Sequence, residues 1–205
     1  LSLHDALPIS LKTLSDTFAF TILLLFMVYD KVKERIKTKE YNSLTLLLEK
    51  NEQIQEKLTE VRVILNADRV KLFQFHNGDH YIGGDSALKC SITHLSLKAG
   101  VSYPQNALTC YSNVIITGLG DYIPSTIKNK SFFSRVDDLT DGNWKSVKVS
   151  NGTRTILMMK VGSDPHISGF VIISWHDDVK KPSDEQLLMV EKALDSLSLI
   201  LRTRK

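Results

Sequence analysis

The sequence predicts an α+β domain, an antiparallel sheet with flanking helices, that follows a transmembrane helix and a coiled-coil helix. Three observations predict this fold class. Apolar residues fill short β-rich runs in the second half of the chain, they recur at helical spacing on both sides of those runs, and an uncharged run precedes all of them. The length of 205 residues and the hydrophobic content of 42% suit one globular domain with extensions and exclude general disorder.

The first nine residues, LSLHDALPI, can be encoded by the end of a common short-read sequencing adapter. We therefore expect residues 1–10 to be artefactual and leave them out of the fold reasoning. On this interpretation the native start codon lies outside the sequence.

A membrane anchor is predicted next. Phe18–Tyr29, FAFTILLLFMVY, is a run of twelve uncharged residues, and extension back to Leu11 gives nineteen. A transmembrane helix needs about 20 mainly apolar residues, so we expect residues 11–30 to form a single span. The alternative is a buried helix of a soluble domain.

The segment 31–40 carries five basic and two acidic residues directly after the apolar run. Positive flanks stay in the cytoplasm, so this juxtamembrane segment predicts a folded domain in the cytoplasm, where thiols stay reduced. The net charge of +3 is local to this segment and does not indicate a nucleic-acid partner. Cys90 and Cys110 have no metal or redox spacing and are expected to be small buried hydrophobic residues.

Residues 41–67 are predicted to form a coiled-coil connector helix, because apolar residues occupy the a and d positions of about three heptads. A buried Asn at an a position favours a parallel, in-register homodimer. The alternative is an amphipathic helix that lies on its own domain. The expected dimerisation residues are Leu44, Leu47, Asn51, Ile54, Leu58, Val61 and Leu65.

Residues 68–205 are predicted to form the folded domain. Val70–His76 is a β-rich run closed by the turn pair Asn77-Gly78. Arg154–Val161 and His166–His176 flank a four-residue turn and predict an antiparallel hairpin. Both hairpin strands are apolar on both faces, so the sheet needs terminal helices on one face and residues 80–150 on the other.

The chain is predicted to close with an amphipathic helix. Ser183 is a good N-cap, and Gln186 is placed as its capping-box partner. An apolar stripe then follows at helical spacing, formed by Leu187, Val190, Leu194, Leu197 and Leu201.

In this order of helix, strand, long middle region, hairpin and capped helix, the chain resembles the GAF family of small sensory domains. The likeness is strongest over Arg154–Arg202, which includes Gly169 near the start of a strand, and it extends to Leu58–Phe75. The resemblance implies an antiparallel sheet of five or six strands, with terminal helices on one face and a ligand pocket on the other. The Asn-Lys-Phe-Asp-Glu set of cyclic-nucleotide-binding members is missing, and Cys90 and Cys110 lack the setting of a bilin-attachment cysteine, so the cofactor is unknown.

Strand alternation supplies the candidate ligand-binding residues. Gln74 and His76 share one face of the first run, and Ser174 and His176 share one face of the last. If that face lines the pocket, four polar groups can orient a small ligand within an apolar cavity. The alternative is that these are solvated strand ends.

The densest polar segment is FHNGDHYIGGDS, residues 75–86. Its His76, Asp79 and His80 are the metal-ligand candidates, because imidazole and carboxylate suit Zn²⁺ or Fe²⁺. Asn77-Gly78 argues against the helix that would align the two histidines, so a turn with a mobile loop is the favoured interpretation and no metal site is predicted. No catalytic residue is predicted, and the chain is not expected to be an enzyme.

The function expected from the sequence is that of a homodimeric, membrane-anchored module that senses a small ligand or binds a protein partner, with no output domain in the same chain. The alternative is a docking scaffold at the membrane, whose pocket is plugged by side chains such as Phe132, Phe133 or Trp144. A third alternative is a metal-dependent enzyme that uses the HNGDH segment.

Overall fold

The computed structural model describes the backbone of residues 7–80, 86–102, 111–119, 122–164 and 166–202. These residues fall into two compact units, Leu1–Glu49 and Lys50–Lys205. The helices are α1 (Leu7–Ile64), the 3₁₀ helix η1 (Ile116–Leu119), α3 (Tyr122–Asn129), α4 (Asn143–Ser150) and α5 (Asp184–Arg202). The strands are β1 (Arg69–His80), β2 (Ser86–Leu97), β3 (Val114–Ile115), β4 (Ser131–Arg135), β5 (Thr155–Val161) and β6 (Gly169–Trp175).

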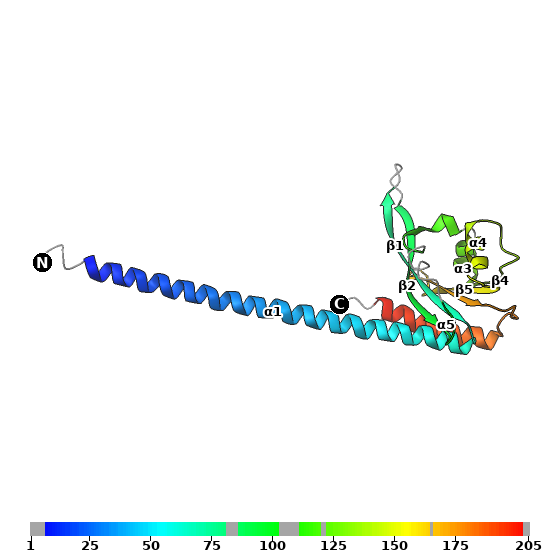
Figure 1. Cartoon of the computed structure of the whole chain (residues 1–205), viewed down its shortest axis with the longest axis horizontal. Helices are drawn as coiled ribbons and strands as arrows, with labels where there is room; N and C mark the ends of the chain where they lie inside the picture. Colours follow the sequence, from blue (N-terminus) through cyan, green and yellow to red (C-terminus); the bar gives the residue numbers. More distant parts are fainter. Residues whose placement is uncertain (1–6, 81–85, 103–110, 120–121, 165, 203–205) are drawn as a thin grey trace. The chain divides into compact units, whose positions relative to one another are not determined.

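The second unit is built on one six-stranded sheet in the order β3-β2-β1-β6-β5-β4. Figure 1 labels β1, β2, β4 and β5 of this sheet. Every neighbouring pair of strands is antiparallel. The predicted α+β class and antiparallel sheet are therefore confirmed, with the larger of the two expected strand numbers.

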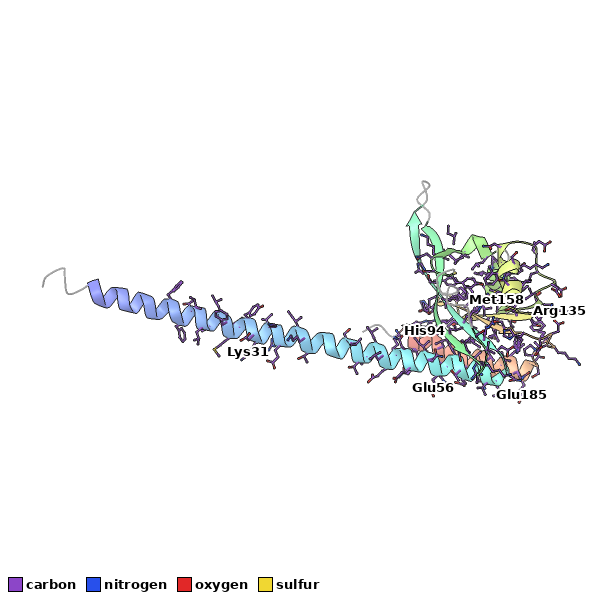
Figure 2. All side chains as sticks on the ribbon, viewed as in Figure 1. Lys31, Glu56, His94, Arg135, Met158 and Glu185 are labelled. Atoms are coloured by element: carbon purple, nitrogen blue, oxygen red, sulfur yellow. The ribbon has the colours of Figure 1, made fainter. Side chains whose placement is uncertain are left out.

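The first unit consists of the N-terminal part of α1. The described side chains of the apolar run Phe18–Tyr29 are exposed, for example 68% for Phe18 and 64% for Phe26 (Figure 2). No helix among the described residues combines the length and the apolarity needed to cross a membrane. The transmembrane helix over residues 11–30 therefore stays a prediction.

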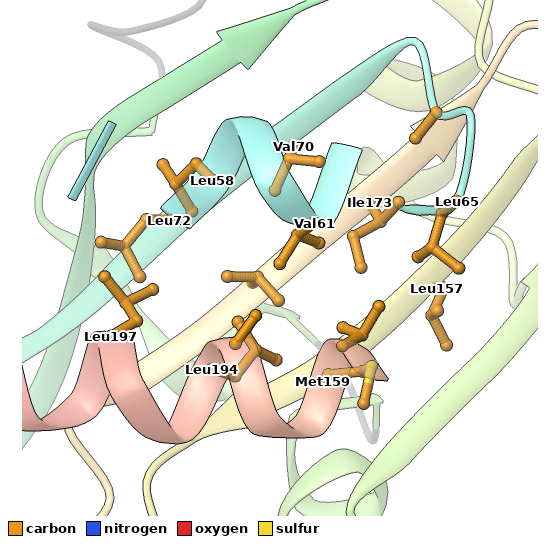
Figure 3. Close-up of a cluster of buried hydrophobic side chains, with 14 of the residues drawn as sticks. Leu58, Val61, Leu65, Val70, Leu72, Leu157, Met159, Ile173, Leu194 and Leu197 are labelled. Carbon is orange, nitrogen blue, oxygen red and sulfur yellow. The ribbon is translucent and has the colours of Figure 1, made fainter. Parts of the chain in front are cut away.

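One face of the sheet is covered by the end of α1 and by α5. Leu58 and Val61 of α1 and Leu65, which directly follows it, are 0–6% exposed and belong to one apolar cluster with Leu194 and Leu197 of α5. Figure 3 shows these side chains lying between the two helices and the strands. The end of α1 thus stabilises the domain by burying apolar surface within its own chain.

This packing explains half of the heptad pattern. Ile54 is 2% exposed and continues the same buried stripe, whereas Leu44 is 56% exposed and Leu47 is 49% exposed. The amide oxygen of Asn51 lies 3.2 Å from Nε2 of His94, so Asn51 has a partner in its own chain. For residues 54–65 the alternative of an amphipathic helix on its own domain accounts for the periodicity, and dimerisation through the heptads stays a prediction.

The capped C-terminal helix is confirmed. Ser183 Oγ accepts a hydrogen bond from the backbone N–H of Gln186 (3.2 Å), and the Ser183 N–H donates to Gln186 Oε1 (3.1 Å). These reciprocal bonds form the predicted capping box at the start of α5. Val190, Leu194 and Leu197 are buried on the sheet, as the apolar stripe predicted.

The predicted hairpin is confirmed as β5 and β6, but its turn was predicted too short. Pairing ends at Val161 with Gly169, so His166 lies in the connection and not in the strand. The chain turns at Gly162, which has φ +96, and the N–H of His166 donates to Ser163 O (2.7 Å). β6 begins at Gly169. A glycine is needed at this position because a Cβ would overlap the carbonyl oxygen of Phe73 on β1.

The turn predicted at Asn77-Gly78 is wrong. β1 continues to His80, and its pairing with β2 includes Asn77 with Leu88 and His80 with Ser86. The register shifts between Asn77 and His80, so the backbone freedom of this pair is used in an irregular stretch of the strand.

The second face of the sheet is covered by the middle of the chain, as predicted. Side chains from η1, α3 and α4 join those of the strands in a separate apolar core. We call the side of the sheet that carries this core the covered face. Phe73 of β1 and Phe170 of β6 stack at its centre, with ring centroids 4.8 Å apart. Cys90 is buried there and is not in a disulfide, as predicted, while Cys110 lies outside the described residues.

Candidate functional site

The structure places the four predicted ligand-binding residues apart. In the antiparallel pair of β1 and β6, Gln74 is the partner of Gly169 and Ser174 is the partner of Arg69. Gln74 is two residues from Leu72 and therefore faces the helix-side core, which is the apolar cluster under the end of α1 and α5, whereas Ser174 is two residues from Ile172 and lies on the covered face. The two predicted pairs, Gln74 with His76 and Ser174 with His176, therefore do not converge on one site.

His76 connects strands. Its Nε2 lies 2.9 Å from Ser91 Oγ on β2, and the same hydroxyl accepts a hydrogen bond from the backbone N–H of Asn113 (2.9 Å). Among the described side chains, no three His, Cys, Asp or Glu residues are grouped so that they could hold a metal ion. The side chains of Asp79 and His80 lie outside the described residues.

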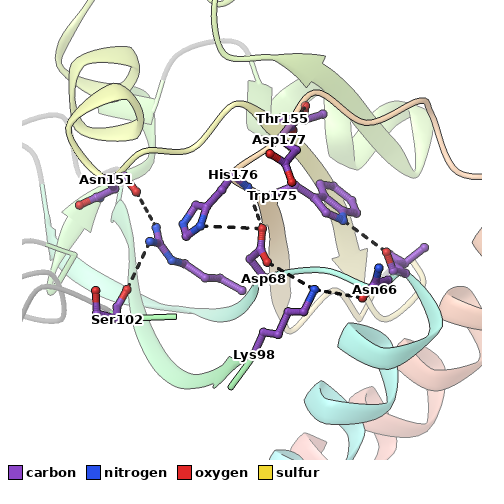
Figure 4. A network of polar contacts seen from close by, with 11 residues as sticks. Asn66, Asp68, Lys98, Ser102, Asn151, Thr155, Trp175, His176 and Asp177 are labelled. Carbon is purple, nitrogen blue, oxygen red and sulfur yellow. Dashed lines mark hydrogen bonds and ion pairs between the residues drawn. The ribbon is translucent and has the colours of Figure 1, made fainter. Parts of the chain in front are cut away.

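His176 belongs to a polar network around Asp68 at the end of the sheet (Figure 4). Asp68 Oδ2 accepts the backbone N–H of His176 (2.8 Å), and Asp68 Oδ1 lies 3.9 Å from Nζ of Lys98. Lys98 also donates to Asn66, whose left-handed backbone (φ 45) ends α1. The network fastens the end of α1 to β2 and to the end of β6.

The covered face contains three buried basic side chains that alternation alone did not single out. Arg69 is 4% exposed, and Lys71 and Lys148 are both 0% exposed. Lys71 alternates with Val70 and Leu72 of the helix-side core, so it shares the face of Phe73. Lys148 comes from α4, on the other side of this core.

Aromatic rings surround the two ammonium groups. Nζ of Lys71 and Nζ of Lys148 lie 5.5 and 5.7 Å from the centre of the Tyr111 ring. Nζ of Lys148 also lies 3.9 Å from the centre of the Trp144 ring. Arg69, next along the same face of β1, donates to the backbone oxygens of Asn151 (2.9 Å) and Ser102 (3.3 Å). We call Arg69, Lys71 and Lys148 the basic cluster.

Electrostatics disfavour charge on both lysines. Burial, together with a smaller effect of the positive charge of Arg69, lowers the pKa of Lys71 to about 7. Burial also holds the pKa of Lys148 well below its usual range, with smaller contributions from the charges of Lys71 and Arg69. The neighbouring charges that act on Lys148 are thus positive, and no ion pair among the described residues includes it.

The hydrogen-bonding capacity of this core is not fully used. Within the described part of the chain, Nζ of Lys148, Nε1 of Trp144 and Oγ of Ser174 are buried without a hydrogen-bond partner. A desolvated cation–π contact contributes about 2 kcal/mol. Removing a charged group from water costs several kcal/mol, so the rings alone do not offset a charged Lys148.

Two of the three side chains expected to plug a pocket do fill this face. Trp144 is 7% exposed within the core of the covered face, and Phe132 packs against that core. Phe133 packs on the opposite, helix-side core because it alternates with Phe132 along β4.

A separate surface groove of about 830 Å³ runs along α5 and the connection between β5 and β6. Both lysines that line it are paired with carboxylates: Lys130 donates to Glu191 (2.8 Å), and Lys160 lies 3.5 Å from Asp164. This local neutralisation makes the groove less suited than the basic cluster to hold a charged ligand.

Comparison with known proteins establishes the fold. No family model and no curated protein matches the sequence. Solved structures match, among them the blue-light-absorbing PixJ GAF domain of Thermosynechococcus elongatus, with a TM-score of 0.54 and 12% identity over 77% of this chain and 88% of that one. The GAF domain of a two-component sensor histidine kinase from Bacillus halodurans gives a TM-score of 0.53 and 15% identity, over 73% of this chain and 90% of that one. The GAF domain/HD domain protein of Geobacter sulfurreducens gives a TM-score of 0.56 and 11% identity, over 74% of this chain and 91% of that one.

The chain has a GAF-like fold. The expectation from the residue pattern is thereby confirmed for the architecture. In this GAF-like domain the helix-side core lies between the sheet and the end of α1 together with α5, and the covered face carries the basic cluster. Identities of 11–15% carry no site residue from those proteins to this chain.

The sequence held a partial signal for the basic cluster. Lys71 lies between Val70 and Leu72 in a run that was predicted to be a strand of a sheet covered on both faces, so a lysine on its second face is unusual. Lys148 gives no such signal, because its helix lies in the middle region, for which no individual element was predicted.

Proposed function

We propose that this protein is a sensory module in which the covered face of a GAF-like domain binds a small ligand. The observation that carries the proposal is that Nζ of Lys148, Nε1 of Trp144 and Oγ of Ser174 are buried on this face without a hydrogen-bond partner among the described residues. Native cores satisfy nearly all such groups, and a ligand can supply the missing partners. The similarity to the GAF domain of a sensor histidine kinase supports a sensory role.

In the proposed mechanism, binding at the covered face changes the packing of the terminal helices on the opposite face. The same strands contact both layers, because alternate residues of β1, β5 and β6 face opposite sides. α1 is one uninterrupted helix from Leu7 to Ile64, so a change at its end can be transmitted along it.

We further propose that the module is a parallel homodimer anchored to the membrane by its N-terminal segment and facing the cytoplasm. The exposed apolar run Phe18–Tyr29 and the basic segment 31–40 support the anchor and its orientation. Leu44 and Leu47 remain exposed and are available for a seam between two copies of α1. No enzymatic step is part of the proposal.

A docking scaffold that binds no small molecule is the second candidate. Trp144 and Phe132 occupy the covered face, which is the feature expected of a plugged pocket. In that case the surface of the domain, and not its core, would contact the partner.

Native mass spectrometry of the full chain, released from detergent micelles, distinguishes these candidates. A dimer with additional bound mass supports the sensor, and denaturation of the sample identifies the ligand. An empty dimer that also fails to bind any member of a metabolite panel supports the docking scaffold. A monomer at all protein concentrations contradicts the dimeric mechanism.

A further inference from the structure

We infer that the basic cluster is the part of the covered face that receives the anionic group of a small organic ligand, a phosphate or a carboxylate. The inference rests on the proposed ligand-sensing function and names the chemical class of its ligand. It does not depend on the membrane anchor or on the oligomeric state.

The geometry of the cluster is the first argument. Two ammonium groups approach the same ring of Tyr111, at 5.5 and 5.7 Å, from opposite layers of the domain. Lys71 lies on strand β1, and Lys148 lies on α4, whose Trp144 belongs to the same apolar core as Phe73 of β1. Two lysines 77 positions apart in the sequence are therefore brought to one point of a nearly dry core.

The balance of charge is the second argument. Arg69 lies on the same face of β1 as Lys71 and adds a third positive group, and its positive charge acts on both lysines. Nζ of Lys148 is fully buried and has no hydrogen-bond partner in the described residues. A buried amine carries its charge only when it is paired or hydrogen-bonded, and no described residue supplies a negative partner for Lys148.

An anion satisfies these requirements together. It accepts hydrogen bonds from the lysines, and charge-assisted bonds of this kind are stronger than neutral ones. The indole Nε1–H of Trp144 and the hydroxyl of Ser174, both unpartnered within the described residues, belong to the same core and can contact the remainder of the ligand. A neutral ligand would leave Lys148 without an ion-pair partner. A cationic ligand would also add positive charge to the basic cluster.

Burial also implies movement. Lys71 and Lys148 are both 0% exposed, so an anion reaches them only when the cover of this face moves, and α4, which carries Lys148, is the element that we expect to move. α4 has eight residues, and its N-cap residue, Gly142, makes no side-chain capping hydrogen bond. We therefore expect the free energy needed to move α4 to be small. Binding under α4 therefore changes the cover of the sheet, as the sensory proposal requires.

The test uses inorganic sulfate as the probe, because its charge is constant near neutral pH. The melting temperature of the full chain in detergent is measured as millimolar sulfate replaces chloride at constant ionic strength. We expect a saturable rise for the unmodified chain and for Lys128→Met, which removes an exposed lysine of α3. Lys148→Met and Lys71→Met remove the buried charges with little change in side-chain length, and we expect at least about tenfold weaker sulfate binding in both.

Folding is controlled without sulfate. Replacing a buried charge by an apolar side chain is commonly neutral or stabilising, so both variants should fold with an unchanged or higher melting temperature. Lys148→Gln serves as a second variant if Met disturbs the core. An equal saturable rise in the buried-lysine variants, or no saturable rise in the unmodified chain, overturns the inference.

The outcomes separate this inference from the proposed function. If native mass spectrometry finds a neutral ligand and sulfate has no saturable effect, ligand sensing stands and the anion site is wrong. If neither a ligand nor a sulfate effect is found, both fail. A co-purified phosphate or carboxylate whose occupancy falls in Lys148→Met supports both.

Discussion

The heptad leucines of α1 serve two separate purposes according to their exposure, and a pair of identical substitutions tests this. Leu58 is 0% exposed in the helix-side core, whereas Leu44, two heptads earlier, is 56% exposed. Leu→Ala at a buried site costs the transfer free energy of the side chain and the cavity left behind, about 3 kcal/mol. For a chain of this size we expect Leu58→Ala to lower the melting temperature by roughly 6–12 °C.

Leu44→Ala is the matched control, because both substitutions make the same change in helix propensity in the same helix. We expect it to change the stability of the domain by less than about 0.5 kcal/mol. The measurement is thermal unfolding of the full chain in detergent, followed by circular dichroism at several protein concentrations. A dimer seam makes the melting temperature depend on concentration, whereas a core inside one chain does not.

The two positions thus have distinct signatures. The buried position should show a large shift at every concentration, and any dependence on concentration should be weakened by Leu44→Ala. If Leu58→Ala unfolds like the unmodified chain at high concentration and loses stability only on dilution, Leu58 is a seam residue and the assignment from burial is wrong.

Three further variants probe the remaining steps. Gly169→Ala places a Cβ against the carbonyl oxygen of Phe73 and should separate β6 from β1, so we expect a large loss of folded protein, measured by expression and circular dichroism. Gly152→Ala is the control: a Cβ there meets no atom although φ is +66, so we expect a much smaller loss of folded protein. Ser183→Ala removes the hydroxyl that accepts the Gln186 N–H and should cost about 1 kcal/mol in denaturant unfolding, and Ser183→Asp should restore most of it. The pKa of Lys71, lowered to about 7 from 10.5, means that the unfolded chain binds more protons between these values, so stability should rise with pH over that window. Lys71→Met should reduce this rise between about pH 7 and 9 and Lys128→Met should not, while an unchanged profile in Lys71→Met would contradict the burial of a titrating amine.

The strands, the closing helix and the two covers of the sheet were predictable because local chemistry and tertiary packing agree there. β5 and β6 are apolar on both faces and are buried on both, and the capping box at Ser183 is a local signal that the structure realises. The turn at Asn77-Gly78 was predicted wrongly because pairing with β2 outweighs the preference of that dipeptide. Pairing with a neighbouring strand outweighs the local turn propensity of a dipeptide, because the neighbouring strand supplies the backbone hydrogen bonds.

The candidate site was less predictable than the fold for a physical reason. Alternation along one strand reports which residues share a face, but it does not report which layer covers that face. Gln74 and Ser174 therefore looked equivalent, although they lie on opposite faces. Lys148 reaches the basic cluster from a helix of the middle region, and only the tertiary fold places it beside the Tyr111 ring.

The sheet is the physical link between the candidate site and the terminal helices. Along β1, Lys71 faces the covered side while its neighbours Val70 and Leu72 pack under Leu58, Val61 and Leu197 on the helix side (Figure 3). A change in the position or charge of Lys71 must therefore act on a strand whose other face carries the end of α1. Close packing gives this strand few alternative positions, so a ligand that moves it by a fraction of an ångström favours one arrangement of the helices over another. In the proposed mechanism, the basic cluster therefore acts on the end of α1 through β1.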